Sequence, residues 1–96
     1  MAQPLSDSEI KTVLDSLEGW KLEGQKIQKE FKFKDFSQAL GFIVRVGIEA
    51  EKQVHHPEIK NVYNTVKIGL NTHDAGDKVT QKDVDLAKAI ESINQK

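Results

Sequence analysis

The chain has 96 residues, enough for one domain with a thin core. Its 14 Lys and Arg residues nearly balance its 15 Asp and Glu residues, and no segment concentrates basic side chains, which argues against a direct nucleic-acid ligand. No cysteine is present, which excludes disulfides and thiolate metal sites, and no apolar run approaches the roughly 18 residues that cross a bilayer. We therefore expect residues 1–96 to form a single domain in the cytoplasm, with the nucleus as a second candidate compartment and no membrane partner.

The N-terminal third predicts a helix followed by two strands. Ser6 and Glu9 have the spacing of a capping box, and Gly19 is a typical helix terminator. Segment 20–22 is predicted to be a short strand, and the two-residue period of segment 26–34 is typical of a half-buried strand in an antiparallel sheet. The apolar stripe of the helix consists of Ile10, Val13, Leu14 and Leu17.

A long second helix is predicted over 36–53, with Asp35 as its N-cap and Gln38 at the reciprocal position. Its apolar residues cover a wide arc, because Val44 and Ile48 lie well away from the main stripe. Such an arc is typical of a helix that contacts a second partner, either another helix or another subunit, but a well-buried central helix would also show it. The predicted stripe consists of Phe36, Leu40, Ile43, Gly47, Ala50 and Val54, widened by Phe42 and Val46.

The C-terminal half predicts a hairpin and a last helix. Strands are expected over 59–63 and 66–72, joined by a turn at 64–65, and alternate residues of the second strand should be buried. Thr80 and Asp83 are predicted to begin the last helix, and the tail at 94–96 should fray. The order of elements predicts an α+β fold in which three helices pack on one face of a four-stranded antiparallel sheet.

All three histidines lie in two short segments. His55 and His56 precede Pro57, and His73 follows the last predicted strand. Imidazole both donates and accepts protons near neutral pH, so one interpretation is a proton-transfer site. In the other, His55 and His56 only stabilise the C-terminus of a helix, and His73 is an ordinary polar residue at the end of a strand. Because Pro57 imposes a bend, both neighbouring rings can face one pocket.

Other chemistry has less support. Glu51 precedes His55 by four residues, so on a continuing helix its carboxylate would orient the imidazole, unless Glu51 is simply exposed. A zinc site with three histidine ligands is disfavoured, because the usual pair of ligands at i and i+4 is absent. The serines lie at helix starts or on helices remote in sequence from any histidine, which gives little support to nucleophilic serine catalysis.

Four motifs follow one another along the chain: Glu51-x-x-x-His55-His56-Pro57, Asn61-Val62-Tyr63-Asn64, Thr72-His73 and Thr80-x-x-Asp83-x-x-Leu86-Ala87. Trp20 and segment 31–36 precede them. In this ordered combination the sequence closely resembles pterin-4a-carbinolamine dehydratases over nearly its whole length. His-His-Pro alone would be far less specific.

The resemblance implies an activity. The family dehydrates 4a-hydroxytetrahydrobiopterin, the carbinolamine that aromatic amino acid hydroxylases produce, to quinonoid dihydropterin without a metal or other cofactor. It therefore implies a carbon–oxygen lyase in tetrahydrobiopterin recycling, with His55 and His73 as acids for the two faces of the pterin. His56 would orient the ring or act as the base. The substrate-binding residues that the resemblance implies are Glu51, Val54, Pro57, Asn71, Thr72 and Asp74.

The resemblance also implies protein partners. Family members are commonly homodimers or homotetramers, consistent with the wide apolar arc of the second helix. Some animal members bind the dimerisation region of a homeodomain transcription factor as coactivators, so the alternative function is a protein-interaction module. Val54, Ile59 and Asn71 depart from the commoner family pattern, which weakens the predicted substrate contacts but not the histidines.

Overall fold

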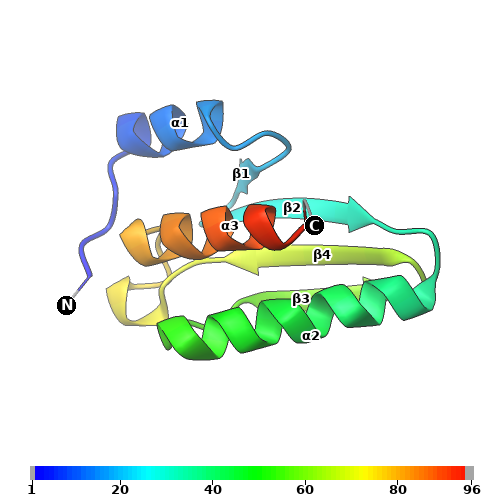
Figure 1. Cartoon of the computed structure of the whole chain (residues 1–96). Helices are drawn as coiled ribbons and strands as arrows, with labels where there is room; N and C mark the ends of the chain where they lie inside the picture. Colours follow the sequence, from blue (N-terminus) through cyan, green and yellow to red (C-terminus); the bar gives the residue numbers. More distant parts are fainter. Residues whose placement is uncertain (1, 95–96) are drawn as a thin grey trace.

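The computed structural model describes residues 2–94, which form an α+β fold (Figure 1). Its elements are α1 (Asp7–Asp15), β1 (Lys21–Glu23), β2 (Lys26–Lys32), α2 (Phe36–Gln53), β3 (Glu58–Val62), β4 (Thr65–Leu70), the 3-10 turn η1 (His73–Ala75) and α3 (Gln81–Asn94). Of the tail predicted to fray, Asn94 is the last residue of α3, and residues 95–96 lie outside the described part of the chain.

The four strands form one antiparallel sheet in the order β1-β2-β4-β3. In the central pair, Ile27 of β2 lies opposite Leu70 of β4, and Phe31 lies opposite Val66. These four side chains are buried, which gives the sheet one apolar face because side chains alternate along each strand. Helices α2 and α3 cover this face (Figure 1), and Ile10 of α1 belongs to the same buried core. The predicted α+β class and four-stranded antiparallel sheet are confirmed.

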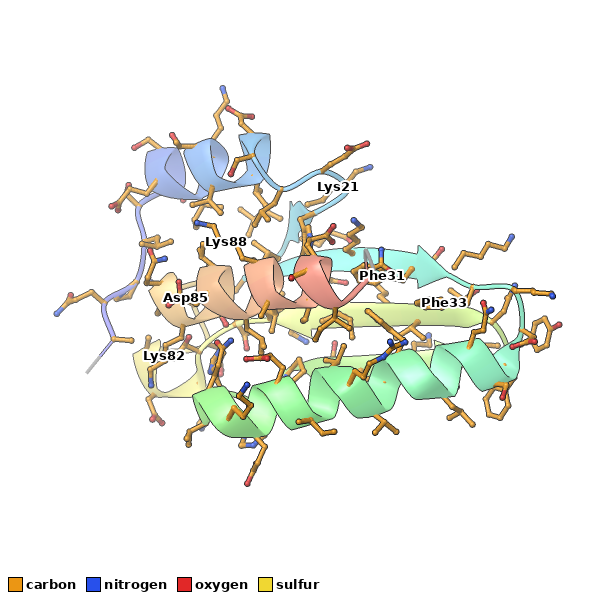
Figure 2. All side chains as sticks on the ribbon, viewed as in Figure 1. Lys21, Phe31, Phe33, Lys82, Asp85 and Lys88 are labelled. Atoms are coloured by element: carbon orange, nitrogen blue, oxygen red, sulfur yellow. The ribbon has the colours of Figure 1, made fainter. Side chains whose placement is uncertain are left out.

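Aromatic side chains join the sheet to α2. The Phe42 ring lies 4.9 Å from the Phe31 ring and 4.9 Å from the Phe33 ring, measured between centroids. Phe31 and Phe33 project from the same face of β2 and the residues that follow it toward the helices (Figure 2). Phe31 and Trp20 pack in a T-shaped arrangement, with ring centroids 6.1 Å apart and ring planes at 73°. These aromatic contacts connect the chain before β1, strand β2 and helix α2.

Local hydrogen bonds explain where the first two helices begin. Ser6 accepts from the Glu9 amide, and the Glu9 carboxylate accepts from the Ser6 amide, so the predicted capping box is confirmed. Asp35 accepts from the Gln38 amide at 2.8 Å and is the predicted N-cap of α2. The Gln38 side chain bonds to the amide of Lys34 rather than to that of Asp35.

The predicted apolar stripe of α2 is wrong for most of its members. The helix buries Ala39, Phe42, Val46 and Ala50, whereas the predicted Phe36, Leu40, Gly47 and Val54 are exposed. Two adjacent apolar rows run along this helix. The row that contains two alanines faces the core because small side chains let the helix axis approach the sheet and α3 closely. Val44 and Ile48, which lie off the buried face, are exposed.

Several predicted boundaries shift by one to four residues. Helix α1 ends at Asp15 rather than at Gly19, and β2 ends at Lys32. The hairpin turn lies at residues 63–64 instead of 64–65, with Tyr63 in the left-handed region at φ 51°. Alternate residues of β4 are buried as predicted, and Gly69 is buried as well. Within residues 2–94, no helix is both long and apolar enough to cross a membrane.

Candidate active site

All three histidines line one pocket of about 300 Å³. The pocket lies where the segment after α2, the end of β4 with η1, and the start of α3 meet. Its lining residues are Val54, His55, His56, Asn71, Thr72, His73, Asp74 and Lys82. Four of the six predicted substrate-binding residues, all except Glu51 and Pro57, are therefore in the lining, and the roles assigned to all six stay predictions.

The end of α2 places its two histidines differently. Val54, the C-cap, is in the left-handed conformation with φ 51° and ψ 44°, which is costly for a β-branched residue. Its amide donates to the carbonyls of Ala50 and Glu51, and the amide of His55 donates to Ala50. This reversal buries the His55 ring and leaves the His56 ring exposed.

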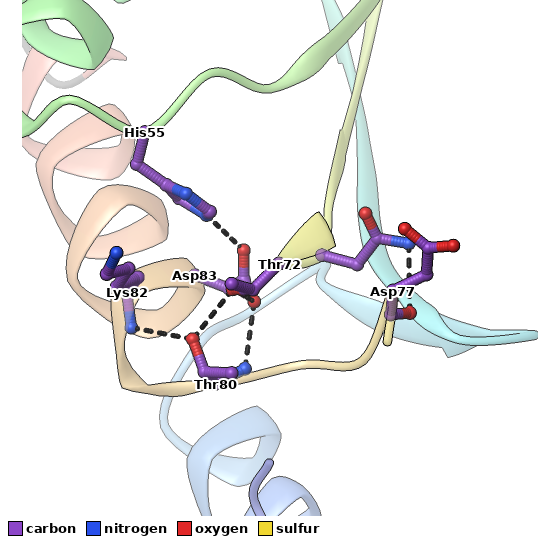
Figure 3. A network of polar contacts seen from close by, with 7 residues as sticks. His55, Thr72, Asp77, Thr80, Lys82 and Asp83 are labelled. Carbon is purple, nitrogen blue, oxygen red and sulfur yellow. Dashed lines mark hydrogen bonds and ion pairs between the residues drawn. The ribbon is translucent and has the colours of Figure 1, made fainter. Parts of the chain in front are cut away.

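His55 is bonded to a buried carboxylate from the last helix. Its Nε2 atom bonds to Oδ1 of Asp83 (Figure 3), at a distance of 2.5 Å. The Asp83 side chain is fully buried. The Oδ2 atom of Asp83 accepts from the Thr80 amide at 2.8 Å and from the Thr72 hydroxyl at 2.9 Å. An ionised carboxylate only accepts hydrogen bonds, so the His55 Nε2–H donates to Asp83.

Two hydroxyl groups extend this network in a fixed direction. Thr72 has a single hydroxyl proton, which it donates to Asp83, so Thr80 must donate in the 2.7 Å bond between the two hydroxyls. The Thr80 hydroxyl in turn accepts from the Lys82 amide at 3.2 Å. In the described residues, no buried side-chain nitrogen or oxygen lacks a partner. The proton of the Thr72 hydroxyl is thus already donated within the protein.

His56 is paired with Glu51, on the exposed side of the segment. Its Nε2 atom lies 2.8 Å from Oε1 of Glu51, and both side chains are mostly exposed. The prediction that Glu51 orients His55 is wrong, because α2 ends at Gln53 and the left-handed Val54 moves His55 off the helical repeat. The carboxylate of Asp83, 28 residues away in sequence, takes that position instead.

His73 lies on η1 at the rim of the pocket, with its side chain 91% exposed. Its Nδ1 atom is 2.9 Å from Oδ1 of Asp77. The hydrogen bond to Asp77, followed by the negative charges of Asp77 and Asp74, raises the pKa of His73 above its ordinary value of 6.5. The exposed His73 therefore holds its proton to a higher pH than a free imidazole does.

Four residues of this region were not predicted as site residues: Asp77, Thr80, Lys82 and Asp83. Asp83 was interpreted only as part of a helix cap, which it also is. A signal for its burial was present, since Asp83 precedes Leu86, Ala87 and Ile90 by three, four and seven residues and thus shares their apolar face. For Asp77 and Lys82 the sequence offers no comparable signal, because both lie among polar residues. Within residues 2–94, no three His, Asp or Glu side chains come together as a metal site.

The family model for pterin 4 alpha carbinolamine dehydratase matches residues 3–93 of the chain. The chain belongs to this family. A relative from Nostoc sp., provisionally named pterin-4-alpha-carbinolamine dehydratase, is 51% identical over 98% of this chain and 100% of its own length. A relative from Trichormus variabilis with the same provisional name is 50% identical over the same shares.

Two solved structures are similar to this fold. A Brucella melitensis structure, described as a transcriptional coactivator/pterin dehydratase, has a TM-score of 0.89 and 41% identity, covering 95% of this chain and 98% of that one. A pterin dehydratase-like protein, described as a RuBisCO assembly factor of the alpha-carboxysome, has a TM-score of 0.67 and 20% identity, covering 79% of this chain and 89% of that one. The second likeness shows the fold alone.

Proposed function

We propose that this member of the family dehydrates a pterin 4a-carbinolamine, namely 4a-hydroxytetrahydrobiopterin, to quinonoid dihydropterin in the cytoplasm, as a step of tetrahydrobiopterin recycling. One observation carries the proposal beyond the family. Each of the three imidazoles around the pocket is bonded to a different carboxylate: His55 to Asp83, His56 to Glu51, and His73 to Asp77. Such pairs set which ring nitrogen carries a proton, which general acid–base catalysis requires.

The reaction needs two proton transfers and no change of oxidation state. The bond between carbon 4a and its hydroxyl oxygen breaks as an imidazolium protonates the leaving hydroxide to water. The electron pair of nitrogen 5 forms the new double bond to carbon 4a, and a base then removes the proton from nitrogen 5. Water and the quinonoid product account for all atoms, so acid–base groups suffice. Each transfer contributes about 10²–10⁴ in rate.

The three histidines differ in their fitness for these steps. His73 is the better candidate for the acid, because its raised pKa lets the ring hold a proton to a higher pH than a free imidazole does. His55 is the second acid, for the opposite face of the pterin. Its Nε2–H is donated to Asp83, so the proton it transfers is the one that the charged ring carries on Nδ1. His56, exposed beside Glu51, orients the ring or takes the proton from nitrogen 5.

The polar edge of the heterocycle would meet the end of β4. Asp74 lines the pocket and is a candidate acceptor for the amino or ring N–H groups of a pterin. Asn71 donates its amide to the carbonyl of Asp77, which leaves its side-chain oxygen for the substrate. Thr72 can offer only its remaining lone pair, because its proton goes to Asp83.

A stopped-flow assay of carbinolamine loss between pH 5 and 9 tests the proposal. His55→Ala combined with His73→Ala should reduce turnover at least about 10²-fold, toward the uncatalysed rate. His73→Ala alone is the safer variant for folding, because its ring is exposed. Lys60→Ala on β3, which is not in the pocket lining, is the control. Dehydration by the double variant at the wild-type rate would refute the enzymatic proposal.

A second function is favoured by an exposed apolar row on α2. Phe36, Leu40, Val44 and Ile48 follow one another at intervals of four residues and are 45%, 43%, 59% and 59% exposed. We propose that this row mediates homodimer or homotetramer formation and is the surface through which an interaction role, with a transcription factor as candidate partner, would act. The description of the similar Brucella protein as a transcriptional coactivator supports this candidate.

Sedimentation velocity tests the assembly. Val44→Glu with Ile48→Glu should convert an oligomer to a monomer, because four charges or more would be buried in a symmetric interface. Lys11→Glu, at an exposed position on α1, changes the charge of each chain by the same amount and is the matched control. A wild-type chain that sediments as a monomer at high micromolar concentration would contradict the proposed self-association.

A further inference from the structure

Asp77 follows η1 and lies outside the pocket lining, but it contacts a residue of the lining. Its Oδ1 atom is 2.9 Å from Nδ1 of His73. Two hydrogen bonds hold its backbone: its carbonyl accepts from the Asn71 side chain at 3.1 Å, and its amide donates to the Thr72 carbonyl at 3.1 Å. The carboxylate is thus carried by a segment that is anchored to the end of β4.

The backbone at Asp77 does not itself require a carboxylate. Its φ is 61°, directly after Gly76 at φ 75°, so two successive residues are left-handed. Glycine and asparagine adopt this conformation at least as readily as aspartate. Among residues 2–94, the only side-chain hydrogen bond of the Asp77 carboxylate is the one to His73. The geometry therefore connects the acidic group to the histidine rather than to the turn.

We propose that Asp77 is a positioning residue that holds the proton of His73 on Nδ1, so that His73 acts on the substrate through Nε2. The proposal rests on the dehydratase function proposed above. An ionised carboxylate only accepts, so Nδ1 carries a proton in both charge states of the ring. The charged ring then gives its Nε2 proton to the leaving hydroxide, and the neutral ring takes a proton back from solvent at the same atom.

Other charges act on His73 as well. The charged and titratable groups around it are Asp74 and Asp77 on its own loop, His55 and His56 after α2, and Lys82 at the start of α3. The two aspartates favour the charged imidazole, whereas Lys82 and a charged histidine oppose it. Asp77 is the one carboxylate of this set that is in hydrogen-bond contact with the ring.

Two substitutions separate the charge of Asp77 from its hydrogen bond, and both suit the left-handed backbone. Asp77→Asn retains an oxygen that can accept from Nδ1–H but removes the charge, and Asp77→Gly removes both. Asp15→Asn at the end of α1 changes the net charge equally and is the control. The two measurements are a ¹⁵N-resolved NMR titration of the His73 ring and the pH profile of kcat and KM for carbinolamine dehydration.

We expect the His73 titration midpoint to move to lower pH in both variants and the Nδ1–H form to be retained in Asp77→Asn but lost in Asp77→Gly. The alkaline limb of kcat should move in the same direction. Turnover at pH 7.5 should fall roughly 1.5- to 5-fold in Asp77→Asn, the effect typical of an exposed ion pair, and further in Asp77→Gly, with little change in KM. Asp15→Asn should match the wild type.

Two results would overturn the proposal. One is a His73 titration and protonated nitrogen that are unchanged in Asp77→Gly. The other is a changed titration with an unchanged pH profile of kcat, which would show that the ring oriented by Asp77 transfers no proton. A wild-type protein without dehydratase activity would instead refute the proposed function, and the NMR arm would still decide whether Asp77 sets the proton position.

Discussion

The His55–Asp83 and His73–Asp77 pairs consist of the same two chemical groups in opposite environments. The first is buried, and its carboxylate also accepts from Thr72 and Thr80. The second is on the surface, and its carboxylate bonds to the histidine alone among the described side chains. Burial makes the first pair structurally indispensable, because unpaired polar groups in the core are costly. The second pair can be altered with little effect on folding, which suits it to tuning a proton transfer.

The largest expected effect is that of removing the buried carboxylate. Asp83→Ala should lower the free energy of unfolding by about 3–5 kcal/mol, because it leaves His55, the Thr72 hydroxyl and the Thr80 amide without their acceptor. Urea denaturation followed by circular dichroism measures the change. Asp83→Asn retains an acceptor for the two threonine donors and should cost less. A loss below about 1 kcal/mol in Asp83→Ala would contradict the contrast between the two pairs.

Removal of the Thr72 hydroxyl should have an intermediate effect on the free energy of unfolding. Thr72→Val preserves the shape of the side chain but removes the donor to Asp83 and the acceptor for Thr80, so we expect a loss of about 1–3 kcal/mol in the free energy of unfolding. Thr72→Ser should recover most of this loss. Thr65→Val on β4, a half-buried position far from the network, provides the matched control. Equal stability of the valine and serine variants at position 72 would show that the network adds nothing.

The exposed His73–Asp77 pair should affect chiefly how the free energy of unfolding depends on pH. The pKa of His73 is higher in the folded than in the unfolded protein. The pair therefore contributes fully to the free energy of unfolding below the unfolded-state pKa of about 6.5, and this contribution is lost as the pH rises through the folded-state pKa. The stability advantage of the wild type over Asp77→Asn should therefore be greater at pH 5.5 than at pH 9. Parallel urea titrations at the two pH values measure it. A larger advantage at pH 9 would reverse the inferred sign.

The smallest effect is expected at the third pair. Glu51→Gln should leave the free energy of unfolding unchanged within error, because both partners are mostly exposed and such pairs contribute little. If His56 is the base for nitrogen 5, the variant should still change the pH profile of kcat, since it removes the charge beside that ring. Urea denaturation measures the effect of Glu51→Gln on stability, and stopped-flow kinetics on the same sample measure its effect on the pH profile of kcat. A stability loss as large as that of Asp83→Ala would show that the Glu51 pair is structural after all.

Much of the fold could be predicted because the signals are local. The capping box of Ser6, the N-cap Asp35 and the alternating burial of β4 involve residues within a few positions of one another, and the structure confirms them. The buried face of α2 could not be predicted in this way. It carries two adjacent apolar rows, and only the close approach of α2 to the sheet and α3 selects the row with Ala39 and Ala50.

The sequence by itself determined that three histidines would stand at a helix end and a strand end, where the chain bends, and its motifs identified the family. Only the tertiary structure decided which carboxylate each histidine meets. Asp83 reaches His55 across 28 residues because β4 and α3 pack against the end of α2, whereas the nearer Glu51 is turned toward His56. The physical reason is that hydrogen bonds of buried side chains are satisfied by neighbours in space, and sequence spacing specifies those neighbours only within a single helix or strand.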